Sequence, residues 1–193
     1  MSQAQATFVK SASDASGIPP NGKPQVALFG RSNVGKSSLI NALTGQKGLS
    51  RASKTPGRTR LINIFDTGAY FLIDLPGYGF AKAAKHEADA FQSLIIEYLD
   101  EAPITFALVV IDMRHGPSEQ DLAMMESLRG REVPFVVVAN KSDKLNRSEQ
   151  TLELKKLRSQ ITDVDLVAVS TETKDGISEL KTIISSRLHK PTA

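Results

Sequence analysis

Residues 30–37 read Gly30-Arg31-Ser32-Asn33-Val34-Gly35-Lys36-Ser37. This is the pattern G-x-x-x-x-G-K-[ST], with an apolar run before it and an amphipathic stretch after it, which predicts a strand, a glycine-rich turn and a helix. Backbone N–H groups in such a turn form a nest for phosphate oxygens, and the start of the helix adds its unpaired amides and positive dipole end. We therefore predict a nucleoside triphosphate site that extends to Ser38. In it, Lys36 reaches the β- and γ-phosphates and the Ser37 hydroxyl binds Mg²⁺.

The composition is typical of a single globular domain. The chain has 193 residues, of which 40% are hydrophobic and 23% are charged. It contains no cysteine, which excludes disulfides, thiolate metal sites and thiol nucleophiles. The first residues lack the layout of a secretory signal, and no apolar run approaches the length of a membrane span. We expect a cytoplasmic protein with no membrane partner, and we expect a monomer.

The charge of the chain is distributed unevenly. Residues 1–70 hold nine Lys or Arg and two Asp or Glu, whereas residues 71–193 hold fifteen and nineteen. Much of the excess lies shortly after the phosphate loop, in Lys47, Arg51, Lys54, Arg58 and Arg60. This cluster extends beyond what one nucleotide needs. It indicates either a solvated basic loop or a surface for RNA or another polyanion, and both interpretations stay open.

The order of apolar and amphipathic stretches predicts one α/β domain. Residues 1–24 are rich in Ser, Ala, Gly and Pro, and we interpret them as an N-terminal extension of a domain spanning 25–190. Strands are expected at 25–30, 61–66, 69–74, 104–112, 135–140 and 165–169, and helices at 36–44, 89–99, 118–129, 148–160 and 177–189. This alternation indicates a mostly parallel, six-stranded sheet with helices on both faces. The two-residue connection Thr67-Gly68 predicts a hairpin that adds one antiparallel edge strand.

A second motif follows another apolar strand and reads Asp74-Leu75-Pro76-Gly77. In a P-loop fold, an Asp at the end of the neighbouring strand holds Mg²⁺, usually through water. A Gly three residues later offers its backbone N–H to the γ-phosphate with no side chain in the way. We predict that Asp74 is a metal ligand and that Gly77 contacts the γ-phosphate.

A third motif, Asn140-Lys141-Ser142-Asp143, also ends an apolar strand. A carboxylate here accepts two hydrogen bonds from the N1–H and the 2-amino group of guanine, which adenine does not offer in that arrangement. The stem of Lys141 is expected to lie over the base, and Asn140 to tie this loop to the phosphate loop. The pattern predicts guanine as the base, bound as GTP or GDP.

Two further segments are candidates for the same site. In the turn Val169-Ser170-Thr171 a backbone N–H is expected to contact the guanine O6. The basic loop contains Gly57-Arg58-Thr59-Arg60-Leu61. We choose Thr59 as the residue that brings a hydroxyl to Mg²⁺ and an N–H to the γ-phosphate, with Thr55 as the reserve. The expected metal ligands are thus Ser37, Thr59 and Asp74.

In this order, the motifs resemble the translation-factor-related class of small GTPases. Longer strings at 30–38, 55–59, 74–82 and 112–117 narrow the resemblance to the EngB family of bacterial GTPases, over a stretch from about residue 6 to residue 190. The string D-L-P-G-Y-G-F-A-K at 74–82 is the most specific part. The resemblance implies a Ras-like fold and a Mg²⁺-dependent GTPase that assists assembly of the large ribosomal subunit and is needed for normal cell division and septation. Asn140 departs from the Thr that many members carry.

The residue after Gly77 bears on the rate of hydrolysis. Ras-like enzymes place a Gln there to orient the attacking water, whereas this chain has Tyr78, so we expect slow intrinsic hydrolysis. Our hypothesis is that Asn33 recruits K⁺, which neutralises developing charge; the alternative is that Asn33 only caps the turn. The residues expected to act on the γ-phosphate are Lys36, Thr59, Gly77 and Asn33.

Three functions remain open at this point. The first is a GTPase switch that binds rRNA and proteins of the large ribosomal subunit through its basic switch region. The second is a nucleotide-switched signalling module acting on division proteins, which would share the same chemistry. The third is an ATP-dependent P-loop kinase, although the chain has no insertion large enough for a substrate lid.

Overall fold

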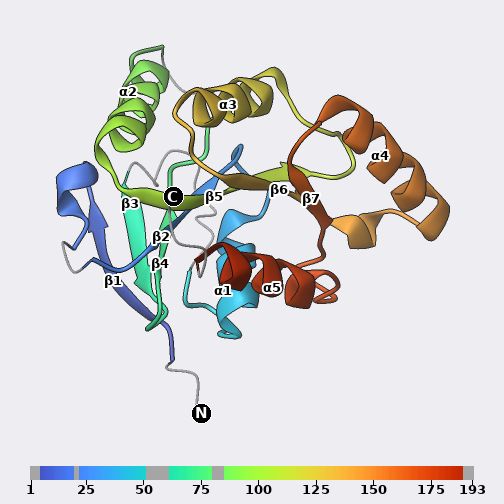
Figure 1. Ribbon diagram of the computed structural model, residues 1–193, viewed down its shortest axis with the longest axis horizontal. Helices are drawn as coiled ribbons and strands as arrows, with labels where there is room; N and C mark the ends of the chain where they lie inside the picture. Colours follow the sequence, from blue (N-terminus) through green and yellow to red (C-terminus); the bar gives the residue numbers. More distant parts are fainter. Residues whose placement is uncertain (1–4, 20–21, 51–60, 80–84, 189–193) are drawn as a thin grey trace.

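The computed structural model describes residues 5–19, 22–50, 61–79 and 85–188. These residues form a three-layer α/β fold around one central sheet (Figure 1). The strands are β1 (Thr7–Ala12), β2 (Gln25–Phe29), β3 (Ile62–Asp66), β4 (Phe71–Asp74), β5 (Ile104–Asp112), β6 (Phe135–Asn140) and β7 (Asp165–Ala168). The helices are α1 (Lys36–Thr44), α2 (Lys85–Glu101), α3 (Glu119–Gly130), α4 (Arg147–Gln160) and α5 (Ile177–Leu188), with short 3-10 turns η1 (Ala15–Gly17) and η2 (Ser142–Lys144).

The sheet confirms the expected mostly parallel architecture. Its strand order is β1-β3-β4-β2-β5-β6-β7, and β3 pairs antiparallel with both of its neighbours, while the pairings among the other strands are parallel. The sheet has seven strands rather than six. The additional strand is β1, which pairs with β3. It lies within residues 1–24, which we expected to be an N-terminal extension.

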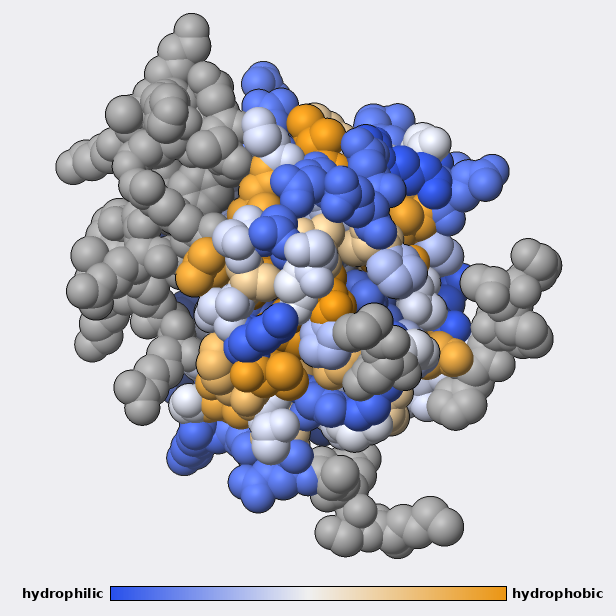
Figure 2. All heavy atoms as spheres, turned by 90° about the vertical axis from the view of Figure 1, so that its left-hand side faces the viewer, coloured by the Kyte–Doolittle hydropathy of each residue, from blue (hydrophilic) through white to orange (hydrophobic). Residues whose placement is uncertain are grey.

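The strand β1 lies at the edge of the sheet and exposes most of its side chains. Phe8 is 51% exposed, yet its ring contacts that of Phe65 edge-on at 5.7 Å between centroids. Figure 2 shows the molecule from the left-hand side of Figure 1, where β1 lies. Over the described residues of this face, hydrophobic and hydrophilic side chains are interspersed. Pairing with β3, rather than a buried apolar face, therefore holds this strand.

Alternation along the strands builds two cores, one on each face of the sheet. On one face α2, α3 and α4 cover a core that includes Ala27, Val109 and Val137. On the other face α1 and α5 cover Leu28, Leu108 and Val138 (Figure 1). Since both faces are covered, the central strands are apolar along their whole length, which is why β5 and β6 have the predicted bounds.

The hairpin between β3 and β4 is present, but its connection is longer than predicted. Asp66 pairs with Phe71, so the loop holds four residues instead of two. The hydroxyl of Thr67 donates to the carbonyl of Tyr70 at 2.7 Å and accepts from the N–H of Tyr70 at 3.1 Å. The N–H of Thr67 also donates to the carbonyl of Tyr70 at 3.0 Å, so the Thr67 side chain supplements a backbone hydrogen bond that closes the loop.

Parallel strands bring their carboxyl ends to one edge of the sheet. The loops that follow β2, β4, β5, β6 and β7 all leave from that edge, and these loops contain the motifs at 30–37, 74–77, 112–117, 140–143 and 169–171. In open α/β sheets this edge is where ligands bind. No helix within the described part of the chain is long and apolar enough to cross a membrane.

Candidate nucleotide-binding site

The phosphate loop connects β2 to α1, as the sequence predicts. Gly35 lies just before the helix with φ of 104°, and a Cβ there would collide with the amide nitrogen of Asn140. Glycine is therefore required both by its backbone conformation and by the close approach of a second loop. Lys36 is buried, and its ammonium donates to the carbonyl of Gly30 at 3.0 Å across the loop. Burial lowers the pKa of Lys36, while the negative charges of Asp74 and Asp121 oppose that shift.

The two described candidate metal ligands lie next to each other. Asp74, at the end of β4, is buried and interacts with the Ser37 hydroxyl at the start of α1. The Oδ1 of Asp74 is buried and has no hydrogen-bond partner among the described residues. Burial raises the pKa of Asp74 to about 6, although Lys36 and Ser37 act to lower it. A buried carboxylate oxygen without a partner beside a hydroxyl fits a hard cation such as Mg²⁺.

Gly77 lies directly against the phosphate loop. A Cβ built on it would stand 2.9 Å from the Lys36 ammonium, and 2.9 Å from both the amide nitrogen and the hydroxyl of Ser32. The Ser32 hydroxyl donates to the carbonyl of Gly77 at 3.2 Å, and the Ser32 N–H donates to the carbonyl of Tyr78 at 2.9 Å. The segments 30–37 and 74–77 thus form one surface.

The phenol of Tyr78 points into the protein, so it is not available to orient a water molecule. Its hydroxyl donates to Asp121 Oδ1 at 2.6 Å. Asp121 is buried and also accepts from the N–H and the hydroxyl of Ser118, which closes the capping box of α3. Burial, together with the charge of Asp121, raises the pKa of Tyr78, so the phenol remains a donor.

Asn140 ties the loop after β6 to the phosphate loop. Its Nδ2 donates to the carbonyl of Val34 at 2.8 Å. Its Oδ1 is buried and has no hydrogen-bond partner within the described part of the chain. The contact shows that the segments 30–37 and 140–143, far apart in the sequence, lie against each other, as we expected for Asn140.

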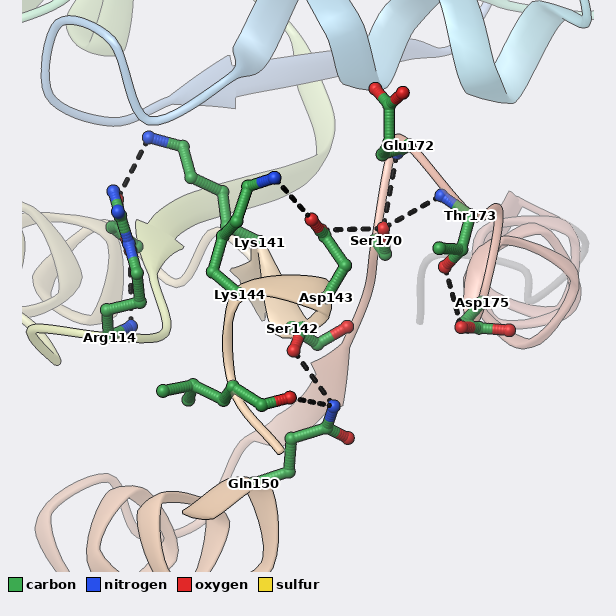
Figure 3. Close-up of polar contacts among 12 residues, drawn as sticks. Arg114, Lys141, Ser142, Asp143, Lys144, Gln150, Ser170, Glu172, Thr173 and Asp175 are labelled. Atoms are coloured by element: carbon green, nitrogen blue, oxygen red, sulfur yellow. Dashed lines mark hydrogen bonds and ion pairs between the residues drawn. The ribbon is translucent and has the colours of Figure 1, made fainter. Parts of the chain in front are cut away.

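The carboxylate of Asp143 is oriented from two sides (Figure 3). Its Oδ1 accepts from the Ser170 hydroxyl at 2.8 Å, and its Oδ2 lies 2.9 Å from the ammonium of Lys144. Hydrogen bonds from Lys144 and Ser170 lower the pKa of Asp143, so the group is an anion at neutral pH. Ser170 in turn accepts from the N–H groups of Glu172 and Thr173 at 3.2 and 3.0 Å.

The segment 169–171 uses most of its backbone for the fold. The N–H of Val169 donates to Ala139 and that of Ser170 donates to Asp175, at 2.9 and 3.0 Å. Within the described residues, Thr171 is the member of the three whose N–H makes no backbone hydrogen bond. The proposed contact with a base therefore falls to Thr171.

Part of the predicted site lies outside the described residues. This holds for Gly57, Arg58, Thr59 and Arg60, and for the reserve choice Thr55. Leu61 is described as an exposed residue immediately before β3. Asn33 has φ of 65° and an exposed side chain, and its carbonyl accepts from the ammonium of Lys141 at 2.7 Å.

Sequence reasoning missed the side chains that hold the predicted ones in place. We expected Ser170 to act through its backbone and Asp121 only to help cap the helix that begins after Ser118, and we gave Asp112 no role. Asp112 ends β5, between the strands that carry the two main motifs, and a polar residue at that position was the available signal. No comparable signal marked Asp121, because a capping residue explains it fully.

Comparisons with known proteins agree with this geometry. A protein-family model described as a 50S ribosome-binding GTPase matches residues 25–141. A protein of Ruegeria sp. (strain TM1040), described as a probable GTP-binding protein EngB, is 43% identical over an alignment of 188 residues, and the match covers 94% of this chain and 87% of that protein.

Two solved structures extend the comparison. A crystal structure of a probable GTP-binding protein EngB has a TM-score of 0.69 and 31% identity, and the match covers 85% of this chain and 98% of that one. The crystal structure of Era in complex with MgGDPNP and nucleotides 1506–1542 of 16S ribosomal RNA has a TM-score of 0.65 and 25% identity, covering 88% of this chain and 58% of that one.

Proposed function

The chain belongs to the EngB family of GTP-binding proteins, and from that premise we propose that it is a Mg²⁺-dependent GTPase that assists assembly of the large ribosomal subunit. One observation carries the nucleotide part of this proposal. The hydrogen bond from Asn140 to the carbonyl of Val34 joins the segment suited to phosphates with the segment suited to guanine. A phosphate release assay tests it. We expect turnover of GTP and none of ATP; equal turnover of both would contradict the proposal.

Mg²⁺ fits the pair Ser37 and Asp74. Within the described residues no cluster of three or more His, Cys, Asp or Glu offers a complete set of metal ligands. Mg²⁺ needs no such cluster, since it is commonly held by one or two protein oxygens together with the phosphates of a nucleotide. We propose that Ser37 and Asp74 hold the ion, with Thr59 as a third ligand when GTP is bound. The ion would neutralise charge on the β- and γ-phosphates, and Lys36 and the N–H of Gly77 would bind the same oxygens.

Guanine is the base that Asp143 suits. With Ser170 and Lys144 on its sides, the carboxylate keeps lone pairs for the N1–H and the 2-amino group of guanine. Adenine would leave the carboxylate without these donors, which costs binding free energy. The stem of Lys141 and the N–H of Thr171 complete the proposed base site.

Intrinsic hydrolysis of GTP should be slow, because the hydroxyl of Tyr78 is hydrogen-bonded to Asp121 and cannot orient water as a Gln does. We propose that K⁺ accelerates the reaction, with Asn33 among its ligands. The test compares turnover in matched KCl and NaCl buffers. Several-fold faster turnover in KCl is expected, and equal turnover would remove K⁺ from the mechanism.

We propose that the partner is the large ribosomal subunit, bound through the basic segment near residues 47–60 by a monomer in the cytoplasm. The excess of Lys and Arg in the first 70 residues supports an RNA partner, as does the description of the matching family model. Sedimentation of the protein with ribosomal particles tests this. Binding is expected with a non-hydrolysable GTP analogue and not with GDP.

A defect in cell division and septation would follow from failed ribosome assembly. The competing idea is a switch that acts on division proteins directly. Depletion of the protein separates the two, because our proposal expects incomplete large subunits to accumulate before septation fails. Septation failure with normal subunits would favour the direct switch.

A further inference from the structure

Asp112 lies beside the loop at 140–143, which we propose to bind the base, because β5 pairs with β6. It is the last residue of β5 and stands opposite Asn140, the last residue of β6. The N–H of Met113 continues the pairing and donates to the carbonyl of Asn140 at 2.9 Å. The carboxylate of Asp112 is thereby placed next to Lys141, the residue that follows Asn140.

Lys141 connects three loops through one ammonium group. It donates to the carbonyl of Asn33 in the phosphate loop at 2.7 Å and to Asp112 Oδ2 at 2.9 Å. The side chains of Lys141 and Asp112 are 26% and 12% exposed, so this pair is better shielded from water than an open surface ion pair. Two acceptors fix the end of a long side chain that would otherwise be free to rotate.

Asp112 is itself held by Arg114. The Nε and the N–H of Arg114 donate to Oδ1 at 2.9 and 3.1 Å, and Nη2 donates to Oδ2 at 2.7 Å. Burial acts to raise the pKa of Asp112, but the hydrogen bonds from Arg114 and Lys141 outweigh it and hold that pKa far below its usual range. Figure 3 shows Arg114 and Lys141 on the side of Asp143 opposite to Ser170.

We propose that Asp112, clamped by Arg114, is a positioning residue for guanine nucleotide binding that acts through Lys141 and makes no contact with the nucleotide. The inference rests on the proposed function, in which the stem of Lys141 covers the base. An ordered Lys141 needs no further ordering when the nucleotide binds, so the site is prepared in advance. Loss of the Asp112 anion would free the lysine.

This role differs from that of Asp143 in what it controls. Asp143 selects among bases, because it bonds to groups on the edge of the ring. Asp112 acts through a lysine that covers the ring and bonds to the phosphate loop, so it should affect every nucleotide that binds this site alike. The two residues are therefore separable by measuring affinities for GDP and for IDP, which lacks the 2-amino group.

The test is Asp112→Asn in the full chain, measured with GDP, IDP and a non-hydrolysable GTP analogue. The amide keeps the shape but accepts weaker hydrogen bonds, so we expect affinity for GDP and for the GTP analogue to fall about tenfold each, through faster dissociation. The ratio of GDP to IDP affinity should stay unchanged. Unchanged affinity, or a change confined to GDP, would overturn the proposal.

Asp100→Asn is the matched control. Asp100 is gripped by Arg131 through Nε at 2.8 Å and Nη2 at 2.6 Å, in a pair remote from the loops described above. The Asp100→Asn variant should bind nucleotides with the affinity of the wild type. If Asp112→Asn lowers the melting temperature of the free protein while nucleotide affinity holds, Asp112 is only structural and the proposal fails.

A double-mutant cycle shows whether Asp112 acts through Lys141. Lys141→Met keeps the apolar stem and removes the ammonium, so adding Asp112→Asn to it should cause no further loss of affinity. Additive losses would contradict the proposal. Should Asp112→Asn fail to fold, Arg114→Ala takes its place, with an expected loss of about threefold and an unchanged affinity as the contrary result.

Wild-type binding separates this inference from the proposed function. Wild-type protein that binds GDP, together with an Asp112→Asn variant that binds it equally well, overturns the positioning role alone. Wild-type protein that does not bind GDP overturns the proposed function and the positioning role together.

Discussion

At the scale of single residues, we predict that Mg²⁺ binding depends on the protonation state of Asp74. Burial raises its pKa to about 6, and a protonated carboxyl is a poor ligand for Mg²⁺. Below that pH a proton competes with the metal, so the Mg²⁺-dependent part of GTP binding should weaken about tenfold per pH unit and stay level between about pH 7 and 8. Titrations with labelled GTP at several pH values check this.

The nucleotide phosphates also titrate near this range, so a control variant is needed. Asp74→Asn lacks the carboxylate, and its residual pH dependence is that of the nucleotide alone. A wild-type profile identical to that of Asp74→Asn would show that Asp74 does not hold the metal.

Gly35 and Gly45 both have positive φ but differ in the space around them. Substituting each one therefore separates the cost of backbone strain from the cost of a steric clash. A Cβ at Gly45 (φ 70°) would meet open space, whereas one at Gly35 (φ 104°) would strike Asn140. Gly45→Ala should cost about 1 kcal/mol of unfolding free energy and leave nucleotide binding intact. Gly35→Ala should cost about 3 kcal/mol, since the bond from Asn140 to Val34 is also lost, and it should abolish GDP binding. Urea unfolding and GDP titration check both, and equal effects would refute the packing argument.

Sequence spacing is enough to propose residues for the phosphates and the base, but it does not reveal the side chains that hold those residues in place. The hydrogen bond from Ser170 to Asp143 and that from Tyr78 to Asp121 join positions 27 and 43 residues apart. Many polar pairs could make such contacts, and only the folded chain decides which do. Glycine and lysine in the phosphate loop, in contrast, are dictated by local geometry and by the ligand.

At the scale of elements, Tyr78 fastens the loop after β4 to the start of α3. Its hydroxyl donates to a buried carboxylate, and such a bond contributes about 2 kcal/mol to stability. Tyr78→Phe should lower the unfolding free energy by that amount in urea titrations. Tyr70→Phe is the control, because within the described residues the hydroxyl of Tyr70 makes no hydrogen bond, and it should change stability by less than about 0.5 kcal/mol. Equal effects would mean that the bond to Asp121 adds nothing.

The elements that the sequence predicted best are those whose pattern follows from burial. Covered on both faces, β5 and β6 read as continuous apolar runs, and their bounds were predicted to the residue. The strand β1 carries exposed residues at five of its six positions, so its pattern gives no sign of a strand. Its place is set by the open edge of β3, which is known only once the sheet exists.

At the scale of the whole molecule, two loops that are far apart in the sequence lie against each other. The phosphate loop follows β2 and the loop at 140–143 follows β6, with β5 between these strands, and the two loops meet at a single edge of the sheet. Everything proposed for the base and the metal follows from that meeting. The central claim is that the base bound at this edge is guanine, selected by Asp143.

The most direct test is calorimetric titration of the wild-type protein and of Asp143→Asn with GDP, ADP and XDP in the presence of Mg²⁺. Wild-type protein should bind GDP and not ADP. The variant should lose GDP affinity by at least about a hundredfold and gain affinity for XDP, because the amide donates to the 2-oxo group of xanthine where the carboxylate accepted from the 2-amino group. Wild-type protein that prefers ADP, or a variant with unchanged preference for GDP, would contradict the account.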